Sequence, residues 1–188
     1  MFEDSDFIKS CDVPGPTKEA IRGLLVYKSN VSIDDIVVDL GCGTGGLTVE
    51  FASRCEKIYS IDKNPLAVEI TKKNIEKLLK TDSNVEFINS NGVKALKHVD
   101  NIDIALIGGS GGELFEILDL INEKLNPNGR ILITSILVDT KVEAVNKLKE
   151  LGYNPKFMEI NVSQGKILDR GILMKAENPI TIISAKKH

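Results

Sequence analysis

The sequence is poor in the residues that build metal centres, disulfide frameworks and histidine-dependent catalytic sites. Its 188 residues include three cysteines, two histidines and no tryptophan. Cys11, Cys42 and Cys55 are odd in number and form no C-x-x-C pair, which argues against a disulfide framework and a zinc site. His98 and His188 are too few for a histidine-based metal site and argue against a serine triad. We therefore expect no protein-bound metal and a reducing compartment.

Long apolar runs and an excess of one charge are also absent. No apolar run approaches the roughly 18 residues that a membrane-spanning helix needs, and residues 1–6 are acidic where a signal peptide would be basic. The 24 basic and 27 acidic side chains give a net charge of −3, which provides no basic footprint for nucleic acid or membrane. These features predict a single-domain cytoplasmic protein that binds neither nucleic acid nor membranes.

The most informative segment is a glycine-rich turn between an apolar run and a helical pattern. Residues 36–38 are β-branched, and residues 41–46 then hold four glycines. The glycines at 41, 43 and 46 fit G-x-G-x-x-G, in which they permit a tight turn and let a ligand approach the backbone. The next apolar run ends on Asp62, about 20 residues downstream, where a carboxylate accepts both ribose hydroxyls. The segment predicts a site for an adenosine-containing cofactor; a simple strand-to-helix turn is the alternative.

Asp39 distinguishes two cofactors that share this geometry. It lies two residues before Gly41, where a dinucleotide site is usually apolar. A carboxylate there would repel a pyrophosphate, whereas it suits the cationic methionine end of S-adenosylmethionine, directly or by orienting the loop. The sequence therefore favours S-adenosylmethionine, with S-adenosylhomocysteine as the product, over NAD. The alternative is that Asp39 only caps a local turn.

Strand and helix patterns alternate along most of the chain, as in a parallel sheet with helices on both faces. The last two strand patterns, residues 156–162 and 180–184, have no helix between them, so we expect them to pair antiparallel. This outline predicts an α/β, Rossmann-like class I methyltransferase fold, with a seven-stranded, mostly parallel sheet of order 3-2-1-4-5-7-6. We expect a single methyltransferase domain, 1–188, in three parts: an N-terminal arm and helix over the cofactor site (1–30), a cofactor-binding core (31–152) and a C-terminal hairpin with a long substrate-side loop (153–188).

Two polar turns are further candidates for cofactor contact. Thr17 follows a Pro-Gly-Pro arm; it either caps the next helix or belongs to a flap that touches the cofactor. Asn91 and Gly92 follow the third strand pattern, where a polar side chain beside a small residue meets an adenine edge. A plain strand-to-helix turn would show the same residues.

Two other segments are candidates for substrate contact. Residues 108–112 hold four glycines in five positions, at a large entropic cost that a mere connector would not need. Their amides follow a strand and suit a carboxylate, so Gly109, Ser110 and Gly111 are candidate substrate-binding residues. In the connection between the last two strands, Arg170 is the best-suited cation, because guanidinium binds carboxylates bidentately. The alternative for residues 108–112 is that the glycines provide flexibility alone. The alternative for the connection that holds Arg170 is a solvated loop with scattered charge.

These segments together resemble the decarboxylating precorrin methyltransferases of cobalamin synthesis, over nearly the whole chain. The resemblance rests on VPGPT (13–17), DLGCGTGG (39–46), IDKNP (61–65), GGSGGEL (108–114), and LDRG (168–171) with NP (178–179). One departure is Ser90-Asn91-Gly92, where relatives tend to have Gly-Asp-Ala.

The resemblance implies methylation of carbon 15 of cobalt-precorrin-6B, with decarboxylation of the C-12 acetate, giving cobalt-precorrin-7. It also implies a homotetramer and a set of cofactor-binding residues: Thr17, Gly41, Cys42, Gly43, Thr44, Gly45, Asp62, Asn91 and Gly92. The sequence identifies no catalytic acid or base. Alternative functions are a tRNA adenine methyltransferase of the same fold, an NAD-dependent oxidoreductase and a non-catalytic nucleoside-binding module.

Overall fold

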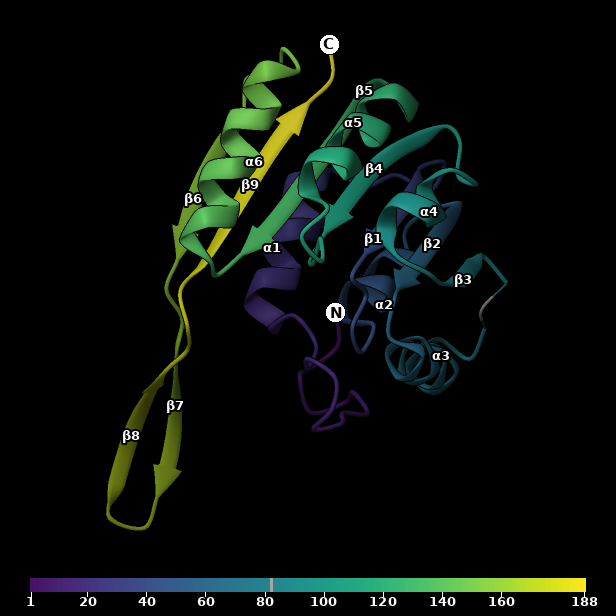
Figure 1. The fold of residues 1–188 in the computed structure, drawn as a ribbon. Helices are drawn as coiled ribbons and strands as arrows, with labels where there is room; N and C mark the ends of the chain where they lie inside the picture. The colour runs from purple at the N-terminus through teal and green to yellow at the C-terminus, as the bar shows by residue number, and fades with distance from the viewer. Residues whose placement is uncertain (82) are drawn as a thin grey trace.

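The computed structural model describes residues 1–81 and 83–188 and shows a mixed sheet between two layers of helices (Figure 1). The sheet contains β1 (Ile36–Leu40), β2 (Lys57–Asp62), β3 (Val85–Asn89), β4 (Ile102–Ile107), β5 (Leu125–Ser135), β6 (Lys156–Ile160) and β9 (Ile180–Lys186). The helices are α1 (Glu19–Ser29), α2 (Gly46–Ala52), α3 (Pro65–Leu79), α4 (Gly92–Leu96), α5 (Leu114–Lys124) and α6 (Val138–Glu150).

The strands lie in the order β3-β2-β1-β4-β5-β9-β6. The first five strands in this order, β3, β2, β1, β4 and β5, pair parallel. In contrast, β9 pairs antiparallel with both β5 and β6. The predicted order is therefore confirmed, with β9 as the seventh strand of this sheet. Because five neighbouring strands are parallel, their carboxyl ends and the loops that follow them meet at one edge.

Two hydrophobic cores cover the two faces of the sheet. Along β4, Ala105 and Ile107 point into the core formed with α4, α5 and α6, whereas Ile104 and Leu106 point into the core formed with α1, α2 and α3. This alternation follows from the period of two in a strand. Since β4 is covered on both faces, its nearly continuous apolar run is explained.

The helix starts agree only in part with the sequence patterns. Asn64 begins α3 as expected: its Oδ1 accepts a hydrogen bond from Leu66 N at 3.0 Å, and Pro65 is the first helical residue. The expectation that Thr17 caps the first helix is wrong. Helix α1 begins at Glu19, its N-cap residue is Lys18, and no side chain caps it.

The connection between β6 and β9 is a second hairpin and not the long loop expected from the sequence. β7 (Ser163–Leu168) and β8 (Gly171–Ala176) pair antiparallel and form a separate two-stranded sheet. We call it the β7–β8 arm. Figure 1 shows it projecting away from the main sheet. Nearly all of its residues are exposed, so the arm adds surface and contributes nothing to either core.

Candidate active site

The two glycine-rich loops lie side by side at the carboxyl edge of the sheet. Gly108 N and Gly109 N donate hydrogen bonds to the carbonyl oxygen of Leu40, at 2.9 and 3.3 Å. The backbones approach so closely that a Cβ atom on Gly41 would lie 2.7 Å from Gly109 N. The loop after β1 and the loop after β4 therefore form one continuous surface.

A cleft of about 410 Å³, which we call the glycine-loop cleft, opens on this surface. Five residues predicted for the cofactor site line it: Gly41, Gly43, Asp62, Asn91 and Gly92. Gly109, Ser110 and Gly111 of the second loop form part of its wall. The cleft thus gathers residues from the ends of β1, β2, β3 and β4.

Asp62 is a fixed acceptor in the wall of this cleft. Its Oδ2 accepts a hydrogen bond from Gly43 N at 3.0 Å, and its Oδ1 accepts one from Asn64 N at 2.9 Å. Each carboxylate oxygen retains a further lone-pair site. Asp62 therefore ties the first glycine loop to the end of β2 and still offers a negative acceptor to a ligand.

Side chains of α3 fix the conformation of the first glycine loop. Thr71 Oγ1 donates to the carbonyl oxygen of Gly43 at 3.1 Å, and Asn74 Nδ2 donates to that of Thr44 at 2.8 Å. Cys42 and Thr44 are buried, and neither lines the glycine-loop cleft. The Thr44 hydroxyl has no hydrogen-bond partner among the described residues. The cleft surface of the loop is therefore mainly backbone, and Gly45, with φ of 84°, is the N-cap residue of α2.

The N-terminal arm is fixed against the same loop. Asn74 Oδ1 accepts from Ile8 N at 2.7 Å, and its Nδ2 donates to Ile8 O at 3.0 Å. The buried Arg22 guanidinium lies 2.6 Å from Asp4 and 3.4 Å from the buried Glu50. These contacts fix the residues that precede Pro14, and Pro14 lines the glycine-loop cleft.

Asp39 lies beneath the loop and not on the cleft surface. It is buried, and its carboxylate accepts a hydrogen bond from the Thr48 hydroxyl at 2.6 Å. The pKa of Asp39 is raised to about 6, mainly by burial and also by the nearby Asp62 charge, against the lowering effect of the hydrogen bonds from Thr48. The carboxylate therefore orients the start of α2 and changes the local potential without lining the cleft.

The raised pKa of Asp39 predicts a pH-dependent stability in the absence of ligand. Burying the ionised form destabilises the fold, so the contribution of Asp39 is most favourable below about pH 4 and is lost as pH rises through 6. Two pKa units correspond to about 3 kcal/mol. In urea unfolding, we expect the free energy of unfolding of Asp39→Asn to rise by about that much, relative to that of the native chain, between pH 4 and pH 7. A stability difference between Asp39→Asn and the native chain that stays constant with pH would contradict this.

Two further cavities adjoin the glycine-loop cleft and share Gly108 with it. One, of about 470 Å³, lies between the N-terminal arm and the base of the β7–β8 arm and is lined by Thr17, Lys18 and Glu177. The other, of about 440 Å³, lies between the second glycine loop and the start of α6. Thr17 thus faces the arm-side cavity and does not line the glycine-loop cleft.

Several residues in these cavities were not anticipated from the sequence. Lys63 and Glu113 line the glycine-loop cleft, where Glu113 Oε1 accepts a hydrogen bond from Asn91 Nδ2 at 3.2 Å. Thr134 and Ser135, at the end of β5, line both adjoining cavities. Both residues could have been proposed from the sequence, because they end a strand whose carboxyl end lies at the same edge of the sheet as the glycine loops.

Arg170 is not brought to these cavities within one chain. It lies in the exposed turn between β7 and β8, and it lines neither the glycine-loop cleft nor the adjoining cavities. The structure therefore groups Gly109, Ser110 and Gly111 at the site and leaves Arg170 outside it.

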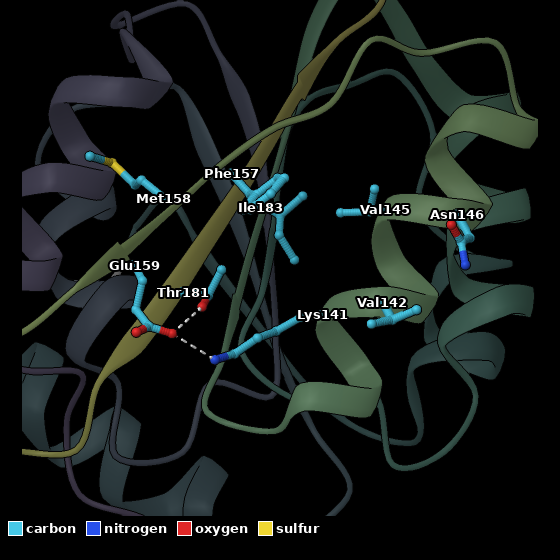
Figure 2. Close-up of a pocket in the computed structure, with 9 residues that line it drawn as sticks. All are labelled: Lys141, Val142, Val145, Asn146, Phe157, Met158, Glu159, Thr181 and Ile183. Atoms are coloured by element: carbon cyan, nitrogen blue, oxygen red, sulfur yellow. Dashed lines mark hydrogen bonds and ion pairs between the residues drawn. The ribbon is translucent and has the colours of Figure 1, made fainter.

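A separate apolar groove of about 450 Å³ runs between α6, β6 and β9. Figure 2 shows Val142 and Val145 on the helix facing Phe157 and Ile183 on the strands. Its charged rim is already paired, with Lys141 Nζ 3.1 Å from Glu159 Oε2. The groove shares no lining residue with the glycine-loop cleft, so we regard it as an apolar surface and not as the reaction site.

The described residues contain neither a cluster of metal-ligand side chains nor a membrane-spanning helix. In residues 1–81 and 83–188, no three histidine, cysteine, aspartate or glutamate side chains are grouped as metal ligands. The expectation of no protein-bound metal stays a prediction. None of the described helices is long and apolar enough to span a membrane.

The strand order, the glycine loop after β1 and the acidic residue at the end of β2 define the class as an S-adenosylmethionine-dependent methyltransferase of the Rossmann-like type. The model of the precorrin methyltransferase domain matches residues 15–187. The chain therefore belongs to the precorrin methyltransferase family.

Comparisons with individual proteins agree with this assignment. The chain is 63% identical to the probable cobalt-precorrin-6B C(15)-methyltransferase (decarboxylating) of Methanobrevibacter smithii, over 100% of both chains. It is similar to the crystal structure of precorrin 8w decarboxylase from Methanobacterium thermoautotrophicum, with a TM-score of 0.96, 43% identity, and coverage of 98% of this chain and 99% of that one. An O-methyltransferase from Thermotoga maritima shares the fold at 16% identity, with a TM-score of 0.78 and coverage of 95% and 69%.

Proposed function

We propose that this enzyme transfers a methyl group from S-adenosylmethionine to carbon 15 of cobalt-precorrin-6B and releases carbon dioxide from the C-12 acetate, giving cobalt-precorrin-7. The observation that carries the proposal is the glycine-loop cleft, which adjoins two further cavities that share the lining residue Gly108 with it. One cleft suits a nucleoside, and the adjoining space suits a larger ring. The 63% identity to a relative named for this reaction supports the choice of substrate.

The residues of the glycine-loop cleft fit the cofactor. A Cβ at Gly41 would lie 2.7 Å from Gly109 N and would force the two glycine loops apart. The fixed Asp62 carboxylate suits the ribose hydroxyls. Asn91 and Gly92, which line the cleft, would meet the adenine edge. Gly43 lines the cleft and would contribute backbone groups, whereas Cys42, Thr44 and Gly45 do not line it and would act by shaping the loop. Thr17 would close the arm side of the site.

The protein's own part in catalysis is alignment and exclusion of water. S-adenosylmethionine, when bound, supplies an electrophilic methyl group. The arm residues from Pro14 to Lys18 line the arm-side cavity, and Pro14 also lines the glycine-loop cleft. The amides of the second glycine loop, together with Lys18, would hold peripheral carboxylates of the corrinoid. The conjugated ring of that substrate can accept the electron pair left by carbon dioxide, so no side-chain nucleophile is needed.

Mass spectrometry of the corrinoid product tests the function directly. We expect the product to carry one added methyl group and to lack one carbon dioxide. A methylated product that retains its carboxylate, or unchanged substrate in a protein that binds S-adenosylhomocysteine, would contradict the proposal. Methylation of tRNA in a parallel assay would favour the RNA alternative, and a larger thermal shift with NADH than with S-adenosylhomocysteine would favour the oxidoreductase.

Because Arg170 lines none of the site cavities of its own chain, we propose that it binds the corrinoid from the β7–β8 arm, either by contacting a part of the substrate that extends beyond the cavities or by reaching the site of another copy. We expect Arg170→Ala to raise the KM for the corrinoid by about tenfold, the effect of losing one charge-assisted contact of about 1.4 kcal/mol. The affinity for S-adenosylhomocysteine, measured by calorimetry, should stay unchanged. Asp169→Ala, in the same turn, is the matched control. Weaker cofactor binding with unchanged corrinoid turnover would remove Arg170 from the substrate site.

We further propose that the chain assembles as a homotetramer. The β7–β8 arm exposes four apolar side chains, Ile167, Ile172, Leu173 and Met174, and Phe157 in the groove of Figure 2 is 70% exposed. An isolated two-stranded hairpin is marginally stable in water, and exposed apolar patches mark interaction surfaces.

Light scattering after size exclusion tests this assembly. We expect Phe157→Glu to convert the tetramer into smaller species, because a charge would be buried in an apolar contact. Tyr27→Glu is the matched control, since Tyr27 is also exposed, at 82%, but lies on α1 and belongs neither to the groove nor to the β7–β8 arm. A monomeric native chain would overturn the proposal.

A further inference from the structure

A basic cavity lies at the edge of the sheet opposite to the glycine loops. It has a volume of about 340 Å³ and is lined by Lys28, Arg130, Lys156, Lys186 and His188, among other residues. Lys156 begins β6 and Lys186 ends β9, so the antiparallel pairing brings both to this edge. Figure 1 shows the C-terminal end of β9 far from the loops of the candidate active site. The cavity shares no lining residue with the glycine-loop cleft.

The lysines of this cavity are not neutralised within the chain. In the described part of the molecule, Lys28, Lys156 and Lys186 take part in no ion pair, whereas five other lysines do. Arg130 and Lys186 stand directly opposite each other on β5 and β9, an arrangement of like charges that destabilises a strand pair. Such a cluster in a chain with a net charge of −3 favours a bound anion.

Arg130 is held in place for such a contact. Its Nε donates to Ser29 O at 2.8 Å, and its Nη2 donates to Asp35 Oδ2 at 2.5 Å. No described residue accepts a hydrogen bond from its Nη1. The guanidinium therefore needs little further ordering to donate one hydrogen bond to a ligand.

We propose that this cavity binds a compact anion with two or more phosphate groups. Three lysines provide compact positive charges that suit phosphate, and Arg130 has too few free nitrogens for the bidentate grip that favours a carboxylate. The volume lies at the lower end of small-molecule sites, roughly 300 to 1,000 Å³. The described lining has no phenylalanine, tyrosine or tryptophan, so a nucleic-acid base would find no such ring on which to stack.

Calorimetry with sodium tripolyphosphate, at about 0.15 M salt to screen non-specific attraction, tests the site on the full chain. We expect the native protein to bind, and the triple variant Lys28→Gln/Lys156→Gln/Lys186→Gln to bind at least tenfold more weakly. The control variant Lys9→Gln/Lys97→Gln/Lys149→Gln changes the net charge equally, at exposed positions outside the cavity, and should bind as the native chain does. Because removing like charges should not destabilise the fold, both variants should unfold at native-like temperatures.

Other outcomes would overturn the proposal. They are no binding by the native chain, an equal loss in both triple variants, or competition by S-adenosylhomocysteine, which would place the anion in the glycine-loop cleft. Tighter binding of citrate than of tripolyphosphate would overturn the choice of phosphate. The test does not depend on the proposed function, because it needs no corrinoid and no turnover.

Discussion

Replacing Gly41 by alanine is expected to abolish cofactor binding. Gly41 has φ of 78°, a backbone conformation that side chains disfavour, and a Cβ there would lie 2.7 Å from Gly109 N and 3.0 Å from Gly109 Cα. Both opposing atoms belong to the backbone, so no rotamer change relieves the overlap. The two glycine loops must separate, and the cleft between them changes shape.

We expect the affinity of Gly41→Ala for S-adenosylhomocysteine to fall by at least about 100-fold, or ~2.7 kcal/mol. The free energy of unfolding should fall by about 2 to 4 kcal/mol, from backbone strain and overpacking together. Calorimetry and urea unfolding measure the two effects separately.

Gly152→Ala separates strain from site geometry. Gly152 has a similar φ of 86° but no heavy atom within 4 Å of its Cβ position, and it follows α6, away from the cleft. The variant should lose about 1 kcal/mol of stability and bind S-adenosylhomocysteine as the native chain does. If Gly41→Ala binds equally well, the cofactor does not depend on the narrow approach of the two loops.

The fold was predictable because its strands are defined by local patterns. The run Ile102–Ile107 is apolar except for Asp103, which indicates a strand of the parallel core. Residues 180–184 follow residues 156–162 without a helix, which indicates the antiparallel end. The β7–β8 arm was not predictable by the same reasoning. Its strands are exposed on both faces, so burial imposes no alternation of apolar and polar residues on them.

The site was predictable where backbone connectivity decides it and not where long-range contacts do. Parallel strands bring Gly41, Asp62, Asn91 and Gly109 to one edge whatever the side chains are. The inward orientation of Thr44, in contrast, accompanies contacts of its loop with α3, about 30 residues away. Likewise, only the three-dimensional structure reveals that Arg170 lies at the tip of an arm.

The second large effect is expected at Asp62. Substitution by asparagine should weaken cofactor binding almost as much as substitution by alanine. Each oxygen of Asp62 accepts one backbone hydrogen bond, from Gly43 N and from Asn64 N. An asparagine has one oxygen, so its NH₂ group would face one of these N–H donors, and that donor would lose its partner. Charge-assisted hydrogen bonds contribute about 1.5 to 3 kcal/mol each. We expect both variants to lose about 2 to 4 kcal/mol of affinity for S-adenosylhomocysteine, with Asp34→Asn unchanged.

A comparison of ligands distinguishes the ribose contact of Asp62 from its role in holding the loop. If the carboxylate accepts the ribose hydroxyls, the native chain should prefer S-adenosylhomocysteine to its 2′-deoxy analogue by about 1 to 2 kcal/mol, and Asp62→Asn should lose most of that preference. If Asp62 only holds the loop, the variant should weaken the binding of both ligands equally and keep the preference. The interaction energy from this cycle, measured by calorimetry, therefore tests the ribose assignment independently of any change in loop geometry, because such a change affects both ligands alike.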